Sequence, residues 1–144
     1  MTDSDEKTRV LGMIEDGGLR PETETTGTVA HSDIPQFLLS MRVFVQCSAW
    51  EGFPNSLLEA AAVGVPIVAS SVGGMRDFLS HGENALMVPP NDEVSLATAI
   101  ETVLKDERLA ADVSCAGRRW AWQFRPASEE MAWIDLYRRI LQLP

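Results

Sequence analysis

The stretch RVFVQCSAWEGFPNSLLEAAAVGVPIVAS, residues 42–70, decides the fold of this chain. Residues 42–47 and 66–70 are rich in apolar and β-branched side chains, as is typical of strands buried on both faces of a parallel sheet. The glycine, proline and asparagine of residues 49–55 predict a loop after the first strand. Residues 56–63 then predict a helix that ends at Gly64, because glycine readily adopts the left-handed backbone that closes helices.

The same alternation of strands and helices continues outward from this stretch. Upstream, residues 25–29 (TTGTV) predict a short strand, and Ser32 or Asp33 is expected to cap a helix that continues to Met41. Downstream, we expect a short helix over 75–80, a strand over 85–88, and helices over 93–105, 109–120 and 131–141. The pattern predicts an α/β fold, with a Rossmann-like parallel sheet, helices on both of its faces and an α-helical C-terminus.

The composition argues against several classes of protein. Lys and Arg total 12 against 21 Asp and Glu, so the net charge is −9, and such a surface repels the phosphate backbone of nucleic acids. No apolar run reaches the roughly 20 residues that span a bilayer, and the acidic N-terminus is unlike a signal peptide. Cys47 and Cys115 lack the spacing of a zinc site or a disulfide framework, so we expect two reduced, mostly buried thiols.

Two carboxylates beyond the first strand of residues 42–70 are candidates for a ligand site. In a doubly wound sheet, ligands bind beyond the carboxyl ends of the strands. The helix that begins near Asn55 offers the unpaired N–H groups of Asn55, Ser56 and Leu57 to an anion. Glu59 lies roughly 6 Å further along the helix axis, where it can accept hydrogen bonds from a ribose. Glu51 lies on the opposite side of the anion, and this spacing fits a nucleoside-diphosphate sugar.

The motifs of this region resemble a known family. GTVAHSDIP at residues 27–35, the segment from 48 to 70, SVGGMRDFLSHGENALMVPPND at 71–92 and WAWQF at 120–124 follow one another in the chain. Their order is that of the C-terminal half of the group 1, or family 4, GT-B glycosyltransferases, and the resemblance covers roughly residues 25–142. It implies an incomplete C-terminal, nucleotide-sugar-binding domain over residues 25–144. Residues 1–24 are then a polar leader with the remnant of a truncated element.

The resemblance also implies a role for each matching residue. In that family the second glutamate of an E-x7-E pair holds the donor ribose and the first contacts the donor sugar, roles that fall to Glu59 and to the catalytic Glu51. The residues implied to bind the diphosphate are Phe53, Asn55, Ser56 and Leu57, and those implied to line the pocket are Gly73, Gly74 and Arg76. The family transfers a hexose from a nucleoside-diphosphate sugar to a saccharide, lipid or small-molecule acceptor. The transfer retains configuration and uses no metal or other cofactor.

Two departures from the family pattern limit what we expect of this chain. It lacks the Arg and Lys that neutralise the diphosphate in the family, and the N-terminal domain that binds the acceptor. We therefore expect a donor-binding portion that does not transfer sugar by itself and that pairs with a missing N-terminal domain, a separate subunit or a second copy. A catalytically silent module that binds a nucleotide or a partner, or one subunit of a split enzyme, stays open as an alternative. The resemblance implies a cytoplasmic enzyme that in its full form can lie at the membrane surface, without a transmembrane segment.

Overall fold

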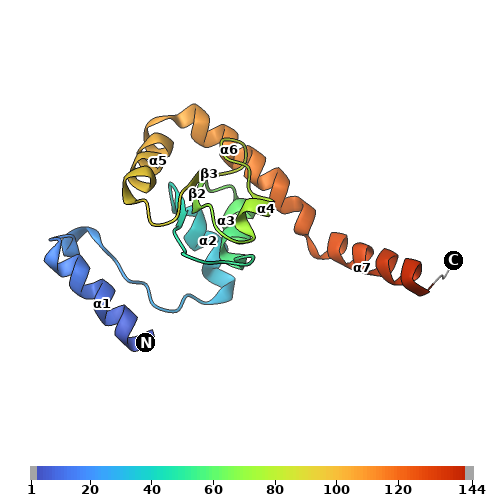
Figure 1. Cartoon of the computed structure of the whole chain (residues 1–144), viewed down its shortest axis with the longest axis horizontal. Coiled ribbons are helices and arrows are strands. Elements are labelled where there is room, and N and C mark those ends of the chain that lie inside the picture. The colour runs from blue at the N-terminus through green and yellow to red at the C-terminus, as the bar shows by residue number, and fades with distance from the viewer. Residues whose placement is uncertain (1–2, 142–144) are drawn as a thin grey trace. The chain divides into compact units, whose positions relative to one another are not determined.

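The computed structural model describes residues 3–141, and the chain forms two compact units, Met1–His31 and Ser32–Pro144 (Figure 1). The N-terminal unit contains helix α1, Asp3–Asp16, and the 3-10 helix η1, Arg20–Glu22. Helix α1 ends just before a glycine pair, where Gly18 has a φ of 65°. Much of the predicted polar leader is therefore helical.

The prediction of a strand at residues 25–29 is wrong. These residues have no regular structure. Gly27 has a φ of 65°, which takes the backbone out of the extended region in the middle of the run. Among residues 3–141, moreover, no strand pairs with this segment, and a β-branched run without a neighbour leaves its backbone groups without a ladder.

Three parallel strands form the sheet of the second unit. They are β1, Phe44–Gln46, β2, Ile67–Ser70, and β3, Leu86–Val88, in the order β1-β2-β3. Phe44 pairs with Ile67, and Val68 pairs with Leu86. The central strand β2 is buried along its whole length. The predicted strands at 42–47, 66–70 and 85–88 are confirmed, although each is shorter in the structure.

The remaining elements are helical. They are η2, His31–Asp33, α2, Ile34–Leu39, α3, Asn55–Val63, α4, Met75–Phe78, α5, Glu93–Lys105, α6, Glu107–Ala121, η3, Trp122–Phe124, and α7, Pro126–Leu141. Gly64 closes α3 with a φ of 87°, as predicted. The carboxylate of Asp92 accepts the N–H of Ser95 at 2.9 Å and so caps α5. Asp33 precedes α2 without a capping hydrogen bond, because its carboxylate accepts the hydroxyl of Ser32 instead.

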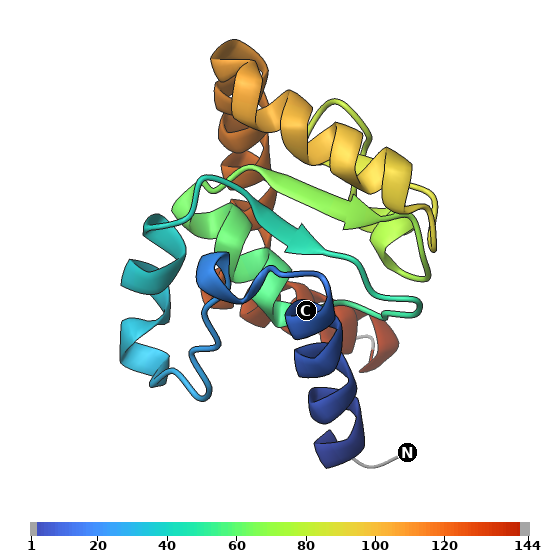
Figure 2. The same cartoon turned by 90° about the vertical axis from the view of Figure 1, so that its left-hand side faces the viewer.

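The side chains of β2 alternate between two cores, one on each face of the sheet. Ile67 and Ala69 pack with buried residues of α3 and α4. Val68 packs with Leu86 and with Ala99 of α5 on the other face. Figure 2 shows α3 and α5 on opposite sides of the strands. The predicted Rossmann-like sheet with helices on both faces is confirmed.

The burial of the two thiols differs from the prediction. Cys47 and Cys115 are both exposed. Cys47 is the first residue beyond β1 and already belongs to a loop. Cys115 lies on the outer surface of α6, where Arg119 contacts its sulfur at 3.0 Å. Cys47 is therefore exposed although it follows a strand directly, and Cys115 is exposed although it lies on an amphipathic helix.

Helix α7 carries an exposed apolar surface. Every residue from 130 to 141 is exposed, and Trp133 and Ile140 keep 58% and 64% of their surface accessible. Trp120 of α6, by contrast, packs against the core on the α3 side. Among residues 3–141, none of the helices combines the length and the hydropathy that crossing a membrane requires.

Candidate functional site

The loop after β1 and the turn after β2 meet at the carboxyl edge of the sheet. Because β1 and β2 are parallel neighbours, their carboxyl ends lie at the same edge. The amide of Gly74 donates a hydrogen bond to the carbonyl oxygen of Glu51 at 3.1 Å, which joins the two segments directly. Helix α3 begins where the first loop ends, so Glu51, Gly73, Gly74 and the start of α3 lie at the same edge of the sheet.

The Glu51 carboxylate is held by neighbouring polar side chains. Its Oε1 accepts hydrogen bonds from Gln46 Nε2 at 3.2 Å and from Ser48 Oγ at 3.0 Å. Gln46 Nε2 also donates to Ser48 Oγ at 2.7 Å. Neither partner is among the residues predicted from the sequence. A glutamine at the end of an otherwise apolar strand was a signal for Gln46, whereas nothing in the sequence singled out Ser48.

The glycine pair packs against the backbone of the Glu51 loop. A Cβ atom added at Gly73 would lie 2.0 Å from the carbonyl oxygen of Glu51, and one added at Gly74 would lie 2.2 Å from that of Gly52. Gly73 also has a φ of 45°, a backbone conformation that side chains disfavour. Both positions therefore require glycine, and the contact fixes where the backbone that carries Glu51 lies.

The first turn of α3 offers fewer open amides than the sequence predicts. The N–H of Leu57 donates to the carbonyl oxygen of Pro54 at 3.2 Å, so the expectation that it is unpaired is wrong. The reason is that the first turn tightens to an i→i−3 bond. Asn55 and Ser56 are exposed, and no backbone hydrogen bond from their amides is found within residues 3–141.

Phe53 anchors the loop through its ring. The ring centroid lies 4.7 Å from that of Phe78 and 5.3 Å from that of Phe124, in an aromatic cluster that also includes Trp120. With its side chain committed to this cluster, Phe53 can contribute only backbone groups to a ligand.

Glu59 is half-buried on α3 and opens to a hollow on the α6 side. This hollow has a volume of about 380 Å³ and is lined by Leu58, Glu59, Ala62, Arg118, Ala121, Trp122, Phe124 and Arg125. The guanidinium of Arg118 lies close over Gly64, since a Cβ built there would lie 2.7 Å from its terminal nitrogen. A cation at this place complements the partial negative charge of the C-terminus of α3. Arg118 and Arg125 are not among the residues predicted from the sequence, because both are far from Glu59 in the chain.

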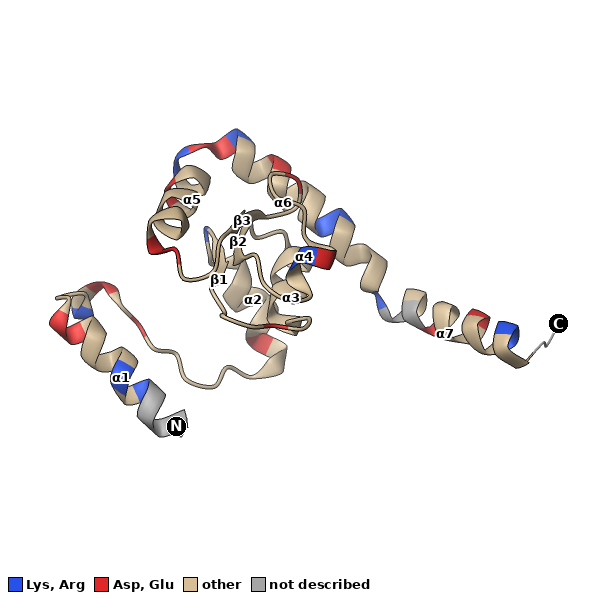
Figure 3. Ribbon diagram, in the orientation of Figure 1, with Lys and Arg blue, Asp and Glu red and all other residues tan. Residues whose placement is uncertain are grey.

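Arg76 follows the glycine pair and lines a separate hollow. It is exposed on α4 and lines a hollow of about 480 Å³ together with Ser71, His81, Met87, Val88, Pro89 and Pro90. Asp77, of opposite charge, follows Arg76 directly in the sequence, and Figure 3 shows a positive and a negative segment side by side at α4. The position of Arg76 is thus near the turn after β2, not in the loop that carries Glu51.

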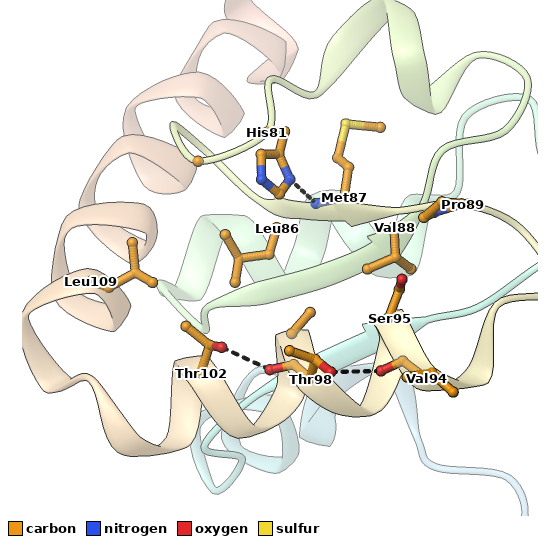
Figure 4. A pocket seen from close by; sticks show the side chains of 12 residues that line it. His81, Leu86, Met87, Val88, Pro89, Val94, Ser95, Thr98, Thr102 and Leu109 are labelled. Atoms are coloured by element: carbon orange, nitrogen blue, oxygen red, sulfur yellow. Dashed lines mark hydrogen bonds between the residues drawn. The ribbon is translucent and has the colours of Figure 1, made fainter.

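A further hollow of about 540 Å³ lies between β3 and α5 (Figure 4). Its walls are mainly apolar, and its threonine hydroxyls donate to the backbone of α5 itself, Thr98 to Val94 at 2.8 Å and Thr102 to Thr98 at 2.7 Å. His81 Nδ1 accepts the N–H of Met87 at 3.0 Å. None of the predicted site residues lines this hollow.

The charges near the carboxyl edge are mostly negative. Asp92 and Glu93 line a small hollow of about 210 Å³ opposite Cys47. Hydrogen bonds from the hydroxyl and the amide of Ser95 lower the pKa of the Asp92 carboxyl, which keeps it ionised. Within residues 3–141, no three His, Cys, Asp or Glu side chains gather closely enough to hold a metal ion.

Comparison with known proteins identifies the family. A family model described as glycosyl transferases group 1 matches residues 3–120, which is most of the chain. The chain belongs to the group 1 glycosyltransferases. This match confirms the resemblance. It begins at residue 3, whereas the first of the motifs that carry the resemblance begins at residue 27.

Solved structures of other proteins share the fold of the chain. The sucrose-phosphate synthase of Thermosynechococcus elongatus superposes with a TM-score of 0.90 at 28% identity, over all of this chain and 36% of that one. HepE of Anabaena, solved in complex with UDP-glucose, gives a TM-score of 0.80 at 27% identity, over 85% of this chain and 34% of its own.

Curated relatives are larger proteins. The exopolysaccharide phosphotransferase of Streptomyces coelicolor is 31% identical over 96% of this chain, and the 2-deoxystreptamine N-acetyl-D-glucosaminyltransferase of Niallia circulans is 30% identical over 74%. The matches cover 15% and 27% of those two proteins. The chain thus spans between about a seventh and a quarter of their length.

Proposed function

We propose that this chain is the donor-binding part of a retaining, metal-independent glycosyltransferase. It would bind a nucleoside-diphosphate sugar for hexosyl transfer to a saccharide, lipid or small-molecule acceptor. The observation that carries the proposal is the junction at the sheet edge, where the glycine pair closes on the loop of Glu51 beside the start of α3. A carboxylate, open helix amides and a close backbone turn are the groups that such a donor needs.

Each part of the donor meets a different group in this proposal. The amides of Asn55 and Ser56, with the dipole of α3, receive the diphosphate. Glu59, one turn further along α3, accepts the ribose hydroxyls, and Glu51 faces the sugar. The complex of HepE with UDP-glucose supports a nucleotide sugar as the ligand, because HepE shares the fold of this chain.

We expect the isolated chain to bind its donor weakly and to transfer nothing. The dipole of α3 supplies only about half a positive charge, and the chain as a whole carries −9. Holding an acceptor in place accounts for roughly 7–11 kcal/mol of a transfer barrier. We assign that task to a second domain or subunit, because residues 3–141 contain a single sheet.

NMR titration of the ¹⁵N-labelled chain tests the donor site. UDP-glucose, GDP-mannose and ADP-glucose serve as probes, each against inorganic phosphate. We expect saturable shifts of the amides of residues 51–57 and 73–74 with at least one nucleotide sugar, at millimolar concentrations. Shifts confined to other regions, or none with any probe, would refute the proposal.

A second candidate function, a partner-binding module, is favoured by α7. Its exposed apolar side chains include Trp133, Tyr137 and Ile140, and surfaces of this kind mark contact sites. Light scattering at micromolar concentration tests self-association. Dimers or larger species that revert to monomers in a Trp133→Ser, Ile140→Ser variant would support it, and a monomeric parent chain would count against it.

A further inference from the structure

Gln46 connects the parts of the site through its side chain. The residue ends β1, and its Nε2 donates to Ser48 Oγ at 2.7 Å and to Glu51 Oε1 at 3.2 Å. Its Oε1 accepts the hydroxyl of Ser56, in the first turn of α3, at 3.4 Å. One carboxamide therefore contacts the loop, the carboxylate and the helix. The amide nitrogen has two N–H groups, and each of them has an acceptor. The amide oxygen has one donor.

The position of Gln46 in the strand is one where an apolar side chain would otherwise pack. Successive side chains of a strand point to opposite faces, so Gln46 shares the face of Phe44, which packs against the core on the α3 side. Val45 packs on the other face, with the core of α5. A half-buried amide at this register costs desolvation that a leucine would not. The hydrogen bonds to Ser48, Glu51 and Ser56 offset this desolvation cost, and all three partners belong to the loop and the helix of the site.

The hydrogen bonds to Glu51 reach one oxygen of its carboxylate. Oε1 receives both Gln46 and Ser48, whereas within residues 3–141 no hydrogen bond reaches Oε2. Two donors on the same oxygen fix the rotation of the carboxylate plane and leave the second oxygen for a ligand. The orientation of the amide follows as well, because the reverse orientation would bring its oxygen against the negatively charged carboxylate.

A neutral donor suits this task better than a cation. A Lys or Arg in the place of Gln46 would neutralise Glu51 and compete with the ligand for it. A carboxylate there would repel it, since the two charged groups would be about 3 Å apart. The carboxamide supplies direction without changing the charge that Glu51 presents.

We propose that Gln46 is a positioning residue for the donor sugar: it holds one oxygen of Glu51, turns the other toward the sugar, and couples that carboxylate to the start of α3 through Ser56. The inference rests on the proposed function, because it takes Glu51 to face the sugar. The role proposed for Gln46 goes beyond the E-x7-E motif, because that motif begins at Glu51 and does not include Gln46.

The first test needs no ligand. In the ¹⁵N spectrum, the side-chain amide of Gln46 should exchange slowly with water, and its two signals should shift in Glu51→Ala and in Ser48→Ala. They should stay unchanged in Glu83→Gln, a control on an exposed turn. Gln46 signals that are identical in the parent chain and in Glu51→Ala would overturn the network.

The second test compares UDP-glucose with UDP, because only the former carries the sugar. We expect Gln46→Met to reduce the ratio of the two affinities by about fivefold, the effect of losing one hydrogen bond. Gln46→Glu should reduce it further, and the affinity for UDP should stay within about twofold in both. Gln36→Met, at an exposed position of α2, is the matched control. A purely structural role of Gln46 would instead weaken the binding of both probes equally, and that result would overturn the inference.

Glu51→Ala separates failure of this inference from failure of the proposed function. If Glu51→Ala lowers the ratio and Gln46→Met does not, Glu51 faces the sugar but Gln46 does not position it. If Glu51→Ala leaves the ratio unchanged, or if the parent chain does not favour UDP-glucose over UDP, the role proposed for Glu51 is wrong and this inference is refuted with it. Should Gln46→Met fail to fold, Ser48→Ala removes the other donor to Oε1 and is expected to lower the ratio in the same direction.

Discussion

Replacing Gly74 by alanine tests whether the glycine pair positions the Glu51 loop. Gly74 has a φ of −64° and a ψ of −19°, which alanine adopts without strain, so the effect of the substitution is steric. The new Cβ would lie 2.2 Å from the carbonyl oxygen of Gly52, and Cβ atoms essentially never approach another atom within 3.0 Å. The two backbones must therefore separate by at least 0.8 Å.

The cost of this separation has three parts. Forcing an extra methyl group into a packed contact destabilises a protein by about 1–3 kcal/mol. The hydrogen bond from the Gly74 amide to Glu51 lengthens as well, which costs up to about 1 kcal/mol. The lower backbone entropy of alanine in the unfolded chain offsets about 0.4–1 kcal/mol. We expect a net loss of about 2 kcal/mol in the free energy of unfolding.

Gly52→Ala is the matched control, because it adds a methyl group to the other side of the same contact. A Cβ at Gly52 would have nothing within 4 Å. Urea unfolding followed by tryptophan fluorescence should give a midpoint for Gly52→Ala equal to or above that of the parent chain, and a clearly lower one for Gly74→Ala. Equal midpoints for the two variants would show that the glycine pair does not pack on the loop as described.

Three other predictions concern the ribose, pH and the thiols. Glu59→Gln should weaken the binding of UDP by about 1.5–3 kcal/mol in calorimetry and leave that of inorganic phosphate unchanged; equal losses for both would contradict the ribose assignment. Because Ser95 holds the pKa of Asp92 below its ordinary value, Asp92 stabilises the fold fully above about pH 4 and loses this effect as the pH falls through the lowered value. Asp92→Asn should therefore make urea stability less sensitive to pH below 4, and an unchanged acid profile would argue against the cap. Cys47 and Cys115, being exposed, should both react with Ellman's reagent in the folded chain, whereas thiols that react only in urea would be buried.

Local signals in the sequence predict most of the fold. The apolar periodicity of residues 93–105 predicts α5 at its observed bounds, and Gly64 ends α3 with the left-handed backbone that glycine adopts readily. The failure at residues 25–29 arises because β-branched composition favours a strand but cannot supply a neighbour, and because Gly27 leaves the extended region. Strand formation depends on pairing, which no single segment determines.

The site is predictable only in part, for a similar reason. Glu51 and the start of α3 lie within one short segment, so their spacing is readable in the sequence. The close approach of Gly73 to Glu51 and of Arg118 to Gly64 joins segments that meet only when the sheet and α6 have packed. The exposure of Cys47 likewise depends on where β1 ends. The sequence predicts a strand through residue 47, whereas β1 ends at Gln46, so Cys47 lies in the exposed loop.

The order of the strands has a consequence for how the chain folds. The sheet order β1-β2-β3 is also the order in the chain, and paired residues such as Phe44 with Ile67 and Val68 with Leu86 are only about twenty positions apart. Short separations keep the entropic cost of closing each loop small and favour rapid folding. As the chain leaves the ribosome, β1, α3 and β2 can assemble before β3 exists. The loop of Glu51 thus belongs to the part of the sheet that can form first, and the glycine pair that packs on it follows only a few residues after β2.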